Sequence, residues 1–293
     1  MSDLTGPFLG RHAVGEGVVT RNQLRPPLFV RLFHDVHVPA GFEITHALRC
    51  RAAAWLAPPT ATLTGCSAAA IYGFDFALPH DPVEFVVDEQ LKFTSQRGMD
   101  IRRSTLGPVG GEPWNEVLLA TPLRASLDIL CNTKLRRSLP RTVGMLDVLL
   151  RAGFVNRDEL TALVHTRHDH GIVRARKCLE LADPRAESIP ESEVRVWLVL
   201  GGMEPELQIN VRDAHGNFLG RLDLGFEEDK LAIEYDGKWH NAPEQARHDA
   251  VRRARMEADG WRFIVVTQEW LRDDPRGLVE AVRSARCRHV VTP

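Results

Sequence analysis

The alternation of apolar and polar residues is sharpest in the last third of the chain. Apolar side chains recur at helical spacing from Pro190 to Leu200, and Gly201-Gly202 ends that stretch. Strand-like patterns follow over residues 207–211, 219–226 and 231–236, then a helix over 243–259, a strand over 261–266 and a helix over 276–285. The pattern predicts an αβββαβα domain over residues 185–293, with a boundary at Asp183-Pro184.

The pattern is weaker in the first two thirds. Residues 8–14 and 20–24 predict two short helices, the second capped by Thr20, and residues 31–38 predict a strand, which is the element order of a winged helix. Residues 41–184 predict helices over 45–56 and 65–73, strands over 82–87 and 99–103, and a helical stretch that opens at Thr121-Pro122. We therefore expect an α/β multidomain protein with a winged-helix-like unit (1–40), a mixed α/β middle domain (41–184) and the C-terminal domain (185–293).

Composition narrows the class of protein. The 293 residues are too many for one ordinary core, and the formal net charge of −2 predicts no global positive field, although the carboxylates of a nuclease centre can mask a local basic face. The five cysteines form no C-x-x-C pair, which argues against a zinc site or a disulfide framework and indicates a cytoplasmic protein. Without an apolar h-region or an 18-residue apolar run, we expect neither secretion nor membrane insertion.

Strand alternation points three carboxylates to one side of the predicted C-terminal sheet. The apolar residues of 221–226 (Leu222, Leu224 and Phe226) share one face, so Asp223 points to the other. The apolar residues of 231–235 likewise leave Glu234 and Asp236 together on the opposite face. If these strands pair, the three anions converge and repel one another unless a cation lies among them. Mg²⁺, with Mn²⁺ as an alternative, prefers such oxygen ligands and can promote attack of water on a phosphodiester.

The spacing of these carboxylates carries a family resemblance. Asp223 precedes Glu234 by eleven positions, and the run Ile233-Glu-Tyr-Asp-Gly-Lys-Trp-His240 continues beyond it. This pattern resembles the PD-(D/E)XK nuclease superfamily and, within it, small endonuclease domains related to very-short-patch repair endonucleases. The later run Gly260–Thr267 fits the same group, so the resemblance covers residues 185–290. It implies a restriction-endonuclease-like fold in which Asp223 and Glu234 bind the metal and Glu191, on the preceding helix, assists.

One position departs from the superfamily pattern. The lysine expected two residues after the glutamate is replaced by Asp236, which would instead join the metal ligands. The repair-endonuclease branch lacks that lysine too and relies on a histidine, which makes His240 the natural substitute as general acid or base. Lys238 is a second substitute, as a displaced lysine. Retention of the fold with loss of activity is the alternative.

Several of these residues have structural interpretations beside the functional ones. Ser188-x-x-Glu191 is a capping box, and Glu191 could also form a surface pair with Arg195; a cap and a ligand can coexist. The predicted helix over 243–259 carries Asp249, a further candidate carboxylate, and several arginines that either form a solvated face or contact phosphates. We select Lys238, Arg247, Arg252 and Arg253 as the candidate nucleic-acid contacts.

The N-terminal region has a looser resemblance. Residues 17–24, 31–38 and 63–69 resemble the winged-helix portion of AbiEi-type antitoxin proteins. This implies a unit that binds DNA or a protein partner, although Pro26-Pro27 lie where a recognition helix would run and proline breaks helices. A small packing domain is the structural alternative.

We therefore expect a Mg²⁺-dependent DNA endonuclease with an N-terminal DNA- or partner-binding unit. The alternative is a non-catalytic DNA-binding regulator, antitoxin-like, that retains a nuclease fold. RNA is not excluded as substrate, and a homodimer and a toxin-like partner are left open.

Overall fold

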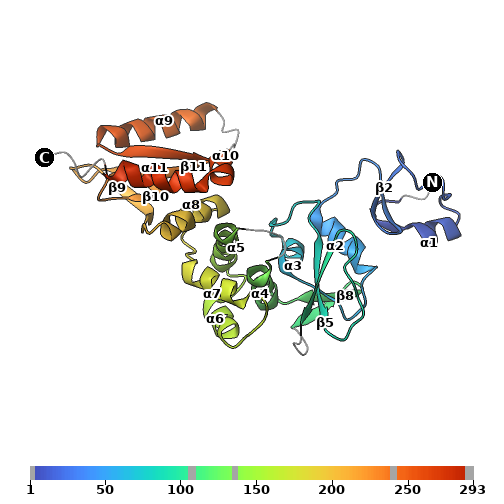
Figure 1. Ribbon diagram of the computed structural model, residues 1–293. Helices are drawn as coiled ribbons and strands as arrows, with labels where there is room; N and C mark the ends of the chain where they lie inside the picture. Colours follow the sequence, from blue (N-terminus) through green and yellow to red (C-terminus); the bar gives the residue numbers. More distant parts are fainter. Residues whose placement is uncertain (1–3, 105–109, 134–137, 238–242, 288–293) are drawn as a thin grey trace. The chain divides into compact units, whose positions relative to one another are not determined.

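The computed structural model describes residues 4–104, 110–133, 138–237 and 243–287, with residues 243–246 as backbone alone. Within those ranges the chain has eleven helices and twelve strands, and the strands form three sheets (Figure 1). This confirms the predicted α/β class. Of the helices described, none has both the length and the apolar character needed to cross a membrane.

The chain divides into two compact units, which do not follow the predicted limits at residues 40 and 184. The first unit contains residues 1–132 and 158–172, and the second contains 133–157 and 173–293. The predicted winged-helix-like unit and most of the predicted middle domain thus share one unit. The helix over residues 139–151 belongs instead with the C-terminal region, because it packs against the helix that opens that region.

The N-terminal part of the first unit is a three-stranded antiparallel sheet of order β1-β3-β2 with one short helix. Its elements are β1 (Phe8–Leu9), α1 (Gly10–Gly15), β2 (Phe29–Phe33) and β3 (Val36–Pro39). The prediction of one strand over 31–38 was therefore wrong, because the chain reverses there as a hairpin. Asp35 permits the reversal with a left-handed φ of 62°, a conformation that aspartate tolerates better than most residues.

The helix predicted over 20–24 is also absent, and these described residues form hydrogen-bonded turns. The amides of Gln23 and Leu24 donate to the Thr20 carbonyl at 3.0 and 3.3 Å, so Thr20 caps a single turn. Pro26 and Pro27 follow at once, and each lacks the N–H that a further helical turn would need.

The rest of the first unit is a five-stranded mixed sheet of order β6-β5-β4-β8-β7 with its helices. Its strands are β4 (Thr62–Leu63), β5 (Val83–Asp88), β6 (Met99–Ser104), β7 (Gly111–Trp114) and β8 (Val117–Ala120), and its helices are α2 (His46–Ala54), α3 (Gly65–Ile71), α4 (Pro122–Cys131) and α6 (Arg157–His165). Thr45 caps α2 and Thr121 caps α4, with Pro122 in the first turn of α4, as predicted. The short strands β4, β7 and β8 escaped prediction because two to four residues carry too little alternation.

A buried carboxylate organises this unit. Asp128 of α4 is 2% exposed and accepts hydrogen bonds from Thr64 Oγ1 at 2.5 Å and from Arg124 Nε at 2.8 Å. Arg102 of β6 forms a second ion pair with the same carboxylate. Two guanidinium groups and a hydroxyl thus compensate one buried anion, as a stable buried charge requires.

The second unit contains the predicted αβββαβα order, with one short helix added after the last strand. Its sheet has the order β12-β11-β10-β9, in which β11 and β12 are parallel and the other pairs antiparallel. The elements are α5 (Leu139–Arg151), α7 (Ile172–Leu181), α8 (Ile189–Leu200), β9 (Glu206–Arg212), β10 (Phe218–Phe226), β11 (Leu231–Asp236), α9 (Pro243–Ala258), β12 (Arg262–Thr267), α10 (Gln268–Asp273) and α11 (Pro275–Cys287).

Helices cover both faces of this sheet (Figure 1). On one face Met256 of α9 packs with Ile209, Leu222 and Trp261. On the other face the apolar residues of α8, α10 and α11 pack with those of the four strands, among them Leu207, Leu224, Ile233 and Val266. The two clusters define an α9 face and an α8 face, and the candidate carboxylates lie on the strands between them.

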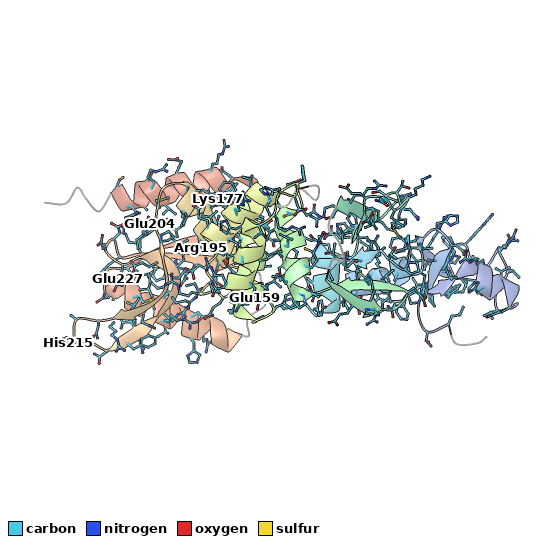
Figure 2. The ribbon with its side chains drawn as sticks, turned by 90° about the horizontal axis from the view of Figure 1, so that it is seen from below. Glu159, Lys177, Arg195, Glu204, His215 and Glu227 are labelled. Carbon is cyan, nitrogen blue, oxygen red and sulfur yellow. The ribbon has the colours of Figure 1, made fainter. Side chains whose placement is uncertain are left out.

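A second buried carboxylate joins α5 to α8. Asp147 is fully buried and accepts hydrogen bonds from Ser192 Oγ at 2.7 Å, Arg195 Nη2 at 3.0 Å and the amide of Asp183 at 2.7 Å. Arg195, labelled in Figure 2, is therefore a buried partner of Asp147, not a surface partner of Glu191. Gly144 lets the helices approach, because a Cβ there would lie 2.9 Å from the Ile189 carbonyl.

Candidate functional site

Asp223 and Glu234 occupy equivalent positions on neighbouring antiparallel strands. The last paired residues of β10 and β11 in this direction are Leu224 and Ile233, and Asp223 and Glu234 come next in the same register. On the other side of β10, Gln208 of β9 lies opposite Asp223, between two paired positions. The strands therefore bring Gln208, Asp223 and Glu234 into one row, which we call the carboxylate row.

At this row the apolar side chains of β10 change from one face of the sheet to the other. Leu224 and Phe226 pack on the α8 face as predicted, but Leu222 packs on the α9 face with Met256. The prediction that all three share a face was therefore wrong. Gln208 gives the physical reason, since its left-handed φ of 56° breaks regular alternation opposite Asp223. The carboxylate of Asp223 thus extends from a twisted segment at the end of the β10–β11 pairing.

Asp223 is a half-buried carboxylate without a compensating partner. Of the residues the structure describes, none donates a hydrogen bond to its carboxylate or forms an ion pair with it. Burial and, secondarily, the negative charge of Glu187 raise the pKa of Asp223, while Arg221 and Arg252 act in the opposite direction. Arg221 is itself paired with Glu187 at 2.7 Å. A positive ion would relieve this uncompensated charge.

Glu234 is also half-buried and has one distant cation. Burial raises the pKa of Glu234, Arg252 and Arg253 lower it, and the charges of Asp223 and Asp249 raise it again. Arg252 Nη2 lies 3.8 Å from Glu234 Oε1 and 3.8 Å from Asp249 Oδ1. The charge of Asp223 thus acts on Glu234, the other predicted metal ligand, together with that of Asp249 of α9.

Glu191 is a helix cap that also lies within the field of the site. Its amide donates to Ser188 Oγ at 3.3 Å, and its carboxylate accepts from the Ser188 hydroxyl at 2.7 Å and the Glu187 amide at 2.9 Å. The Ser188 cap is therefore confirmed, while the Glu191 carboxylate reaches the amide of Glu187 where a standard capping box would use that of Ser188. Burial raises the pKa of Glu191, the bonds from Ser188 and Glu187 lower it, and the charge of Asp223 raises it. Because the charge of Asp223 acts on Glu191, the Glu191 carboxylate can cap the helix and also take part in the site.

Of the remaining predicted catalytic residues, the structure describes only Asp236, which lies beyond the carboxylate row. Asp236 is exposed at the end of β11, where it pairs with Thr267 of β12. His240 and Lys238 lie outside the described residues.

The arginines of α9 divide between the two interpretations that the sequence left open. Arg253 pairs with Glu257 at 3.2 Å and stacks over the Phe263 ring at 4.5 Å, which is a structural role. Arg247 and Arg255 are exposed. Arg252 forms the ion pair with Glu234 and also covers Gly220, where a Cβ would lie 3.0 Å from its Cδ.

The donor set suits a metal ion that keeps much of its water. Among the described residues no three His, Cys, Asp or Glu side chains are grouped closely enough to hold a metal. An all-protein cage is therefore not formed by them. Mg²⁺ commonly binds proteins through one or two carboxylates and several waters. Asp223 and Glu234 match this mode, because the pKa of each is raised and Asp223 has no bonded partner among the described residues.

Sequence reasoning missed Gln208 and Glu187. Both polar atoms of the Gln208 side chain are buried without a hydrogen-bond partner among the described residues. The available signal was a polar residue between Leu207 and Ile209 in a strand whose neighbours are apolar. Glu187 precedes the capping box and carried no such signal.

Comparison with known proteins identifies relatives but no described activity. The Mycobacterium tuberculosis proteins Rv2248 (strain ATCC 25618 / H37Rv) and MT2308 (strain CDC 1551 / Oshkosh), both called uncharacterized, are each 31% identical over 226 residues, covering 75% of this chain and 78% of the relative. No family model matches the chain. The crystal structure of the RV2827C protein from Mycobacterium tuberculosis is similar at 16% identity and a TM-score of 0.42, covering 72% of this chain and 80% of that chain.

Proposed function

We propose that this chain, which belongs to the same family as the mycobacterial proteins Rv2248 and MT2308, is a metal-dependent endonuclease that hydrolyses phosphodiester bonds of DNA. The proposal rests on the αβββαβα unit, on the PD-(D/E)XK-like spacing of its acids and on the carboxylate row. The observation that carries it is the half-buried Asp223, which has no bonded partner among the described residues and lies beside Glu234.

An unpaired carboxylate withdrawn from water is costly for a fold unless something binds it. Elsewhere in the described chain the same problem is solved by protein groups, as at Asp128 and Asp147. At Asp223 the two nearest arginines act only at a distance. A divalent cation shared with Glu234 would supply the missing positive charge.

Under this proposal Asp223 and Glu234 hold Mg²⁺ or Mn²⁺, and Glu191 tunes the site through its charge. The ion would supply Lewis acidity at the scissile phosphodiester. Arg252, whose guanidinium lies 3.8 Å from Glu234, would contact a backbone phosphate beside the row. His240 or Lys238 would transfer the proton, and Asp236 would reach the ion only from an exposed position.

A plasmid-nicking assay with Mg²⁺ and Mn²⁺ tests the proposal. Wild-type protein should convert supercoiled DNA to nicked or linear forms, and Asp223→Ala should reduce the rate at least about 100-fold, because even outer-shell metal partners cost 10–100-fold. The matched control is Asp273→Ala, which removes an exposed carboxylate paired only with its neighbour Arg272. Cleavage that survives Asp223→Ala would reject the site.

Two observations favour a second function, a DNA-binding regulator without catalysis. Arg252 partly neutralises Glu234 without any metal, and the residue in the position of the superfamily lysine, Asp236, is exposed. Binding of DNA, with no cleavage under every metal tested, would support the regulator. The same assay on structured RNA decides between the two nucleic acids. A toxin-like partner, suggested by the AbiEi-like N-terminal pattern, and a homodimer belong to this second function.

A further inference from the structure

Among the described residues, a concavity of about 880 Å³ in the first unit is lined by positively charged side chains and by no negatively charged one. It is lined by residues of β2 and α2 and of the loops that precede β5 and β6. Its polar side chains include Arg31, His34, Arg49, His80 and Arg97. Of the described residues that line it, none is an aspartate or a glutamate. We call it the basic concavity.

The floor of the basic concavity is a buried arginine with neutral partners. Arg49 of α2 is 8% exposed, and its Nη1 donates to the carbonyls of Pro79 and Asp81 at 2.6 and 2.7 Å. Its Nη2 donates to the Gly98 carbonyl at 3.4 Å, and the guanidinium lies 5.2 Å from the centre of the Phe33 ring. Burial lowers the pKa of Arg49, and the negative charge of Asp81 opposes this.

Those contacts orient the guanidinium but do not neutralise it. The bonds account for three of its five N–H groups. The Asp81 carboxylate accepts the amide of Leu78 at 2.9 Å and forms no ion pair with Arg49. Gly98 makes room for the guanidinium, because a Cβ there would lie 2.8 Å from Arg49 Nη2. A buried cation held without a carboxylate is costly unless an anion binds it.

Two further arginines at the basic concavity also lack counter-ions. Arg31 and Arg97 are exposed, and within the part of the chain that the structure describes neither forms an ion pair. Arg31 Nε donates to the Phe33 carbonyl at 3.1 Å, which fixes its direction. His34 and His80, both exposed, add ring N–H groups.

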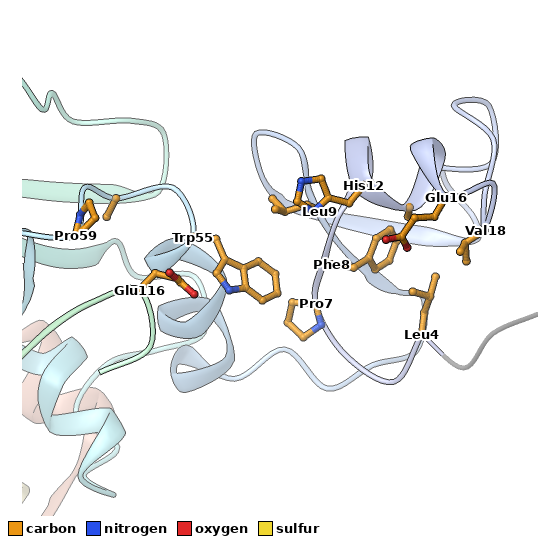
Figure 3. A pocket seen from close by; sticks show the side chains of 12 residues that line it. Leu4, Pro7, Phe8, Leu9, His12, Glu16, Val18, Trp55, Pro59 and Glu116 are labelled. Carbon is orange, nitrogen blue, oxygen red and sulfur yellow. The ribbon is translucent and has the colours of Figure 1, made fainter. Parts of the chain in front are cut away.

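Two other features of the same unit combine positive groups or cavity walls with carboxylates. Arg102 and Arg124 share the carboxylate of Asp128. A second concavity of about 680 Å³ is lined by residues that include Phe8 and Trp55, with carboxylates from Glu16 and Glu116 (Figure 3). The basic concavity differs from both, because no carboxylate stands among the described residues of its lining.

We propose that the basic concavity binds a phosphate group, carried either by a free nucleotide or by a nucleic-acid backbone. Guanidinium groups match phosphate oxygens in pairs, and a phosphate offers more charge and more acceptors than one carboxylate. Because arginines and no carboxylate line the basic concavity among the described residues, the guanidinium groups themselves would bind the anion. The proposal is independent of the nuclease, since no residue of the carboxylate row takes part.

The test measures binding to the full chain in EDTA, so that no metal can attract phosphate to the carboxylate row. Calorimetric titration with pyrophosphate and with adenosine monophosphate forms one arm, and fluorescence anisotropy with a short labelled DNA duplex forms the other. The variants are Arg97→Ala and the double variant Arg31→Ala/Arg97→Ala, which remove exposed side chains and spare the buried Arg49. The matched control is Arg51→Ala, an exposed arginine of α2 outside the lining.

We expect the double variant to lower the affinity for whichever ligand binds by at least about tenfold, whereas Arg51→Ala should change that affinity little. If the source is a nucleic acid, the slope of log affinity against log salt should fall by about 1 for each arginine removed. Tight pyrophosphate or nucleotide binding without DNA binding would assign the free ligand. Absence of binding in both arms, equal binding by the double variant, or equal binding of a polyglutamate peptide would overturn the proposal.

Discussion

Asp147 and Asp223 are two aspartates of the second unit that are withdrawn from water, and their surroundings are opposite. Asp147, between α5 and α8, accepts three hydrogen bonds, one of them from the guanidinium of Arg195. Asp223, in the carboxylate row, has no bonded partner among the residues described. A compensated buried charge holds two elements together, whereas an uncompensated one reserves a position for a ligand.

The first unit contains the same contrast between a compensated and an uncompensated buried charge, but there the compensated charge is an aspartate and the uncompensated one an arginine. Asp128 is compensated by Arg102 and Arg124, and its neighbourhood is closed. Arg49 is buried with neutral partners at the floor of the basic concavity. The carboxylate row and the basic concavity are thus complementary in charge, which is why we assign a cation to one and an anion to the other.

The compensated side of the comparison predicts the largest effect on stability. Asp147→Ala should lower the free energy of unfolding by about 3–5 kcal/mol, because Arg195 would remain buried without its anion. Urea denaturation measures this. The control is Glu180→Ala, which removes an exposed ion pair with Lys177 and should cost less than about 1 kcal/mol. Similar losses for both variants would mean that the Asp147 network contributes no more than a surface pair.

Removing the charge of Asp223 should have the opposite effect on stability, because Asp223 lacks the bonded partners of Asp147 although burial raises the pKa of both aspartates. Because burial and Glu187 raise the pKa of Asp223, the folded chain holds that proton more tightly than the unfolded chain does. This contribution to stability is present below the unfolded pKa of about 3.9 and is lost as pH rises through the folded pKa. Asp223→Asn should therefore be at least as stable as wild type at neutral pH in EDTA, with its advantage vanishing in acid.

Denaturation at several pH values, with Asp147→Asn in parallel, checks this sign. Asp147→Asn should destabilise at neutral pH, because it removes the anion that Arg195 needs. A loss of stability in Asp223→Asn at neutral pH would show that Asp223 has a structural partner and would remove the basis for the comparison.

The smallest expected effect distinguishes the helix-capping role of Glu191 from its role at the carboxylate row. Glutamine also serves in a capping box, so Glu191→Gln should leave the free energy of unfolding within about 0.5 kcal/mol of wild type, whereas Ser188→Ala should cost about 1 kcal/mol. If the Glu191 charge acts on the site, Glu191→Gln should nevertheless reduce the rise in melting temperature that Mg²⁺ or Mn²⁺ produces. Calorimetry with and without metal measures both. An unchanged metal response would leave Glu191 as a cap alone.

The elements of residues 185–293 were predictable because their periodicity is long and their caps are strong. The helix from Ser188 and the strands over 218–226 and 231–236 were found nearly to the residue. The hairpin of β2 and β3 was not, since its reversal depends on one left-handed residue, Asp35. The change of face at Asp223 was missed for a similar reason, because it depends on the backbone of Gln208 in another strand.

The sequence by itself determined which carboxylates could share a site, because spacing and alternation along two strands limit the choice to a few positions. Only the tertiary structure decided which charges are compensated. Arg195 and Arg252 look alike in the sequence, yet the first is buried on Asp147 and the second lies at the carboxylate row. Arg49 likewise becomes the floor of a concavity only when Phe33, Pro79 and Gly98 surround it. Compensation depends on contacts between residues far apart in the chain, and local periodicity carries no information about them.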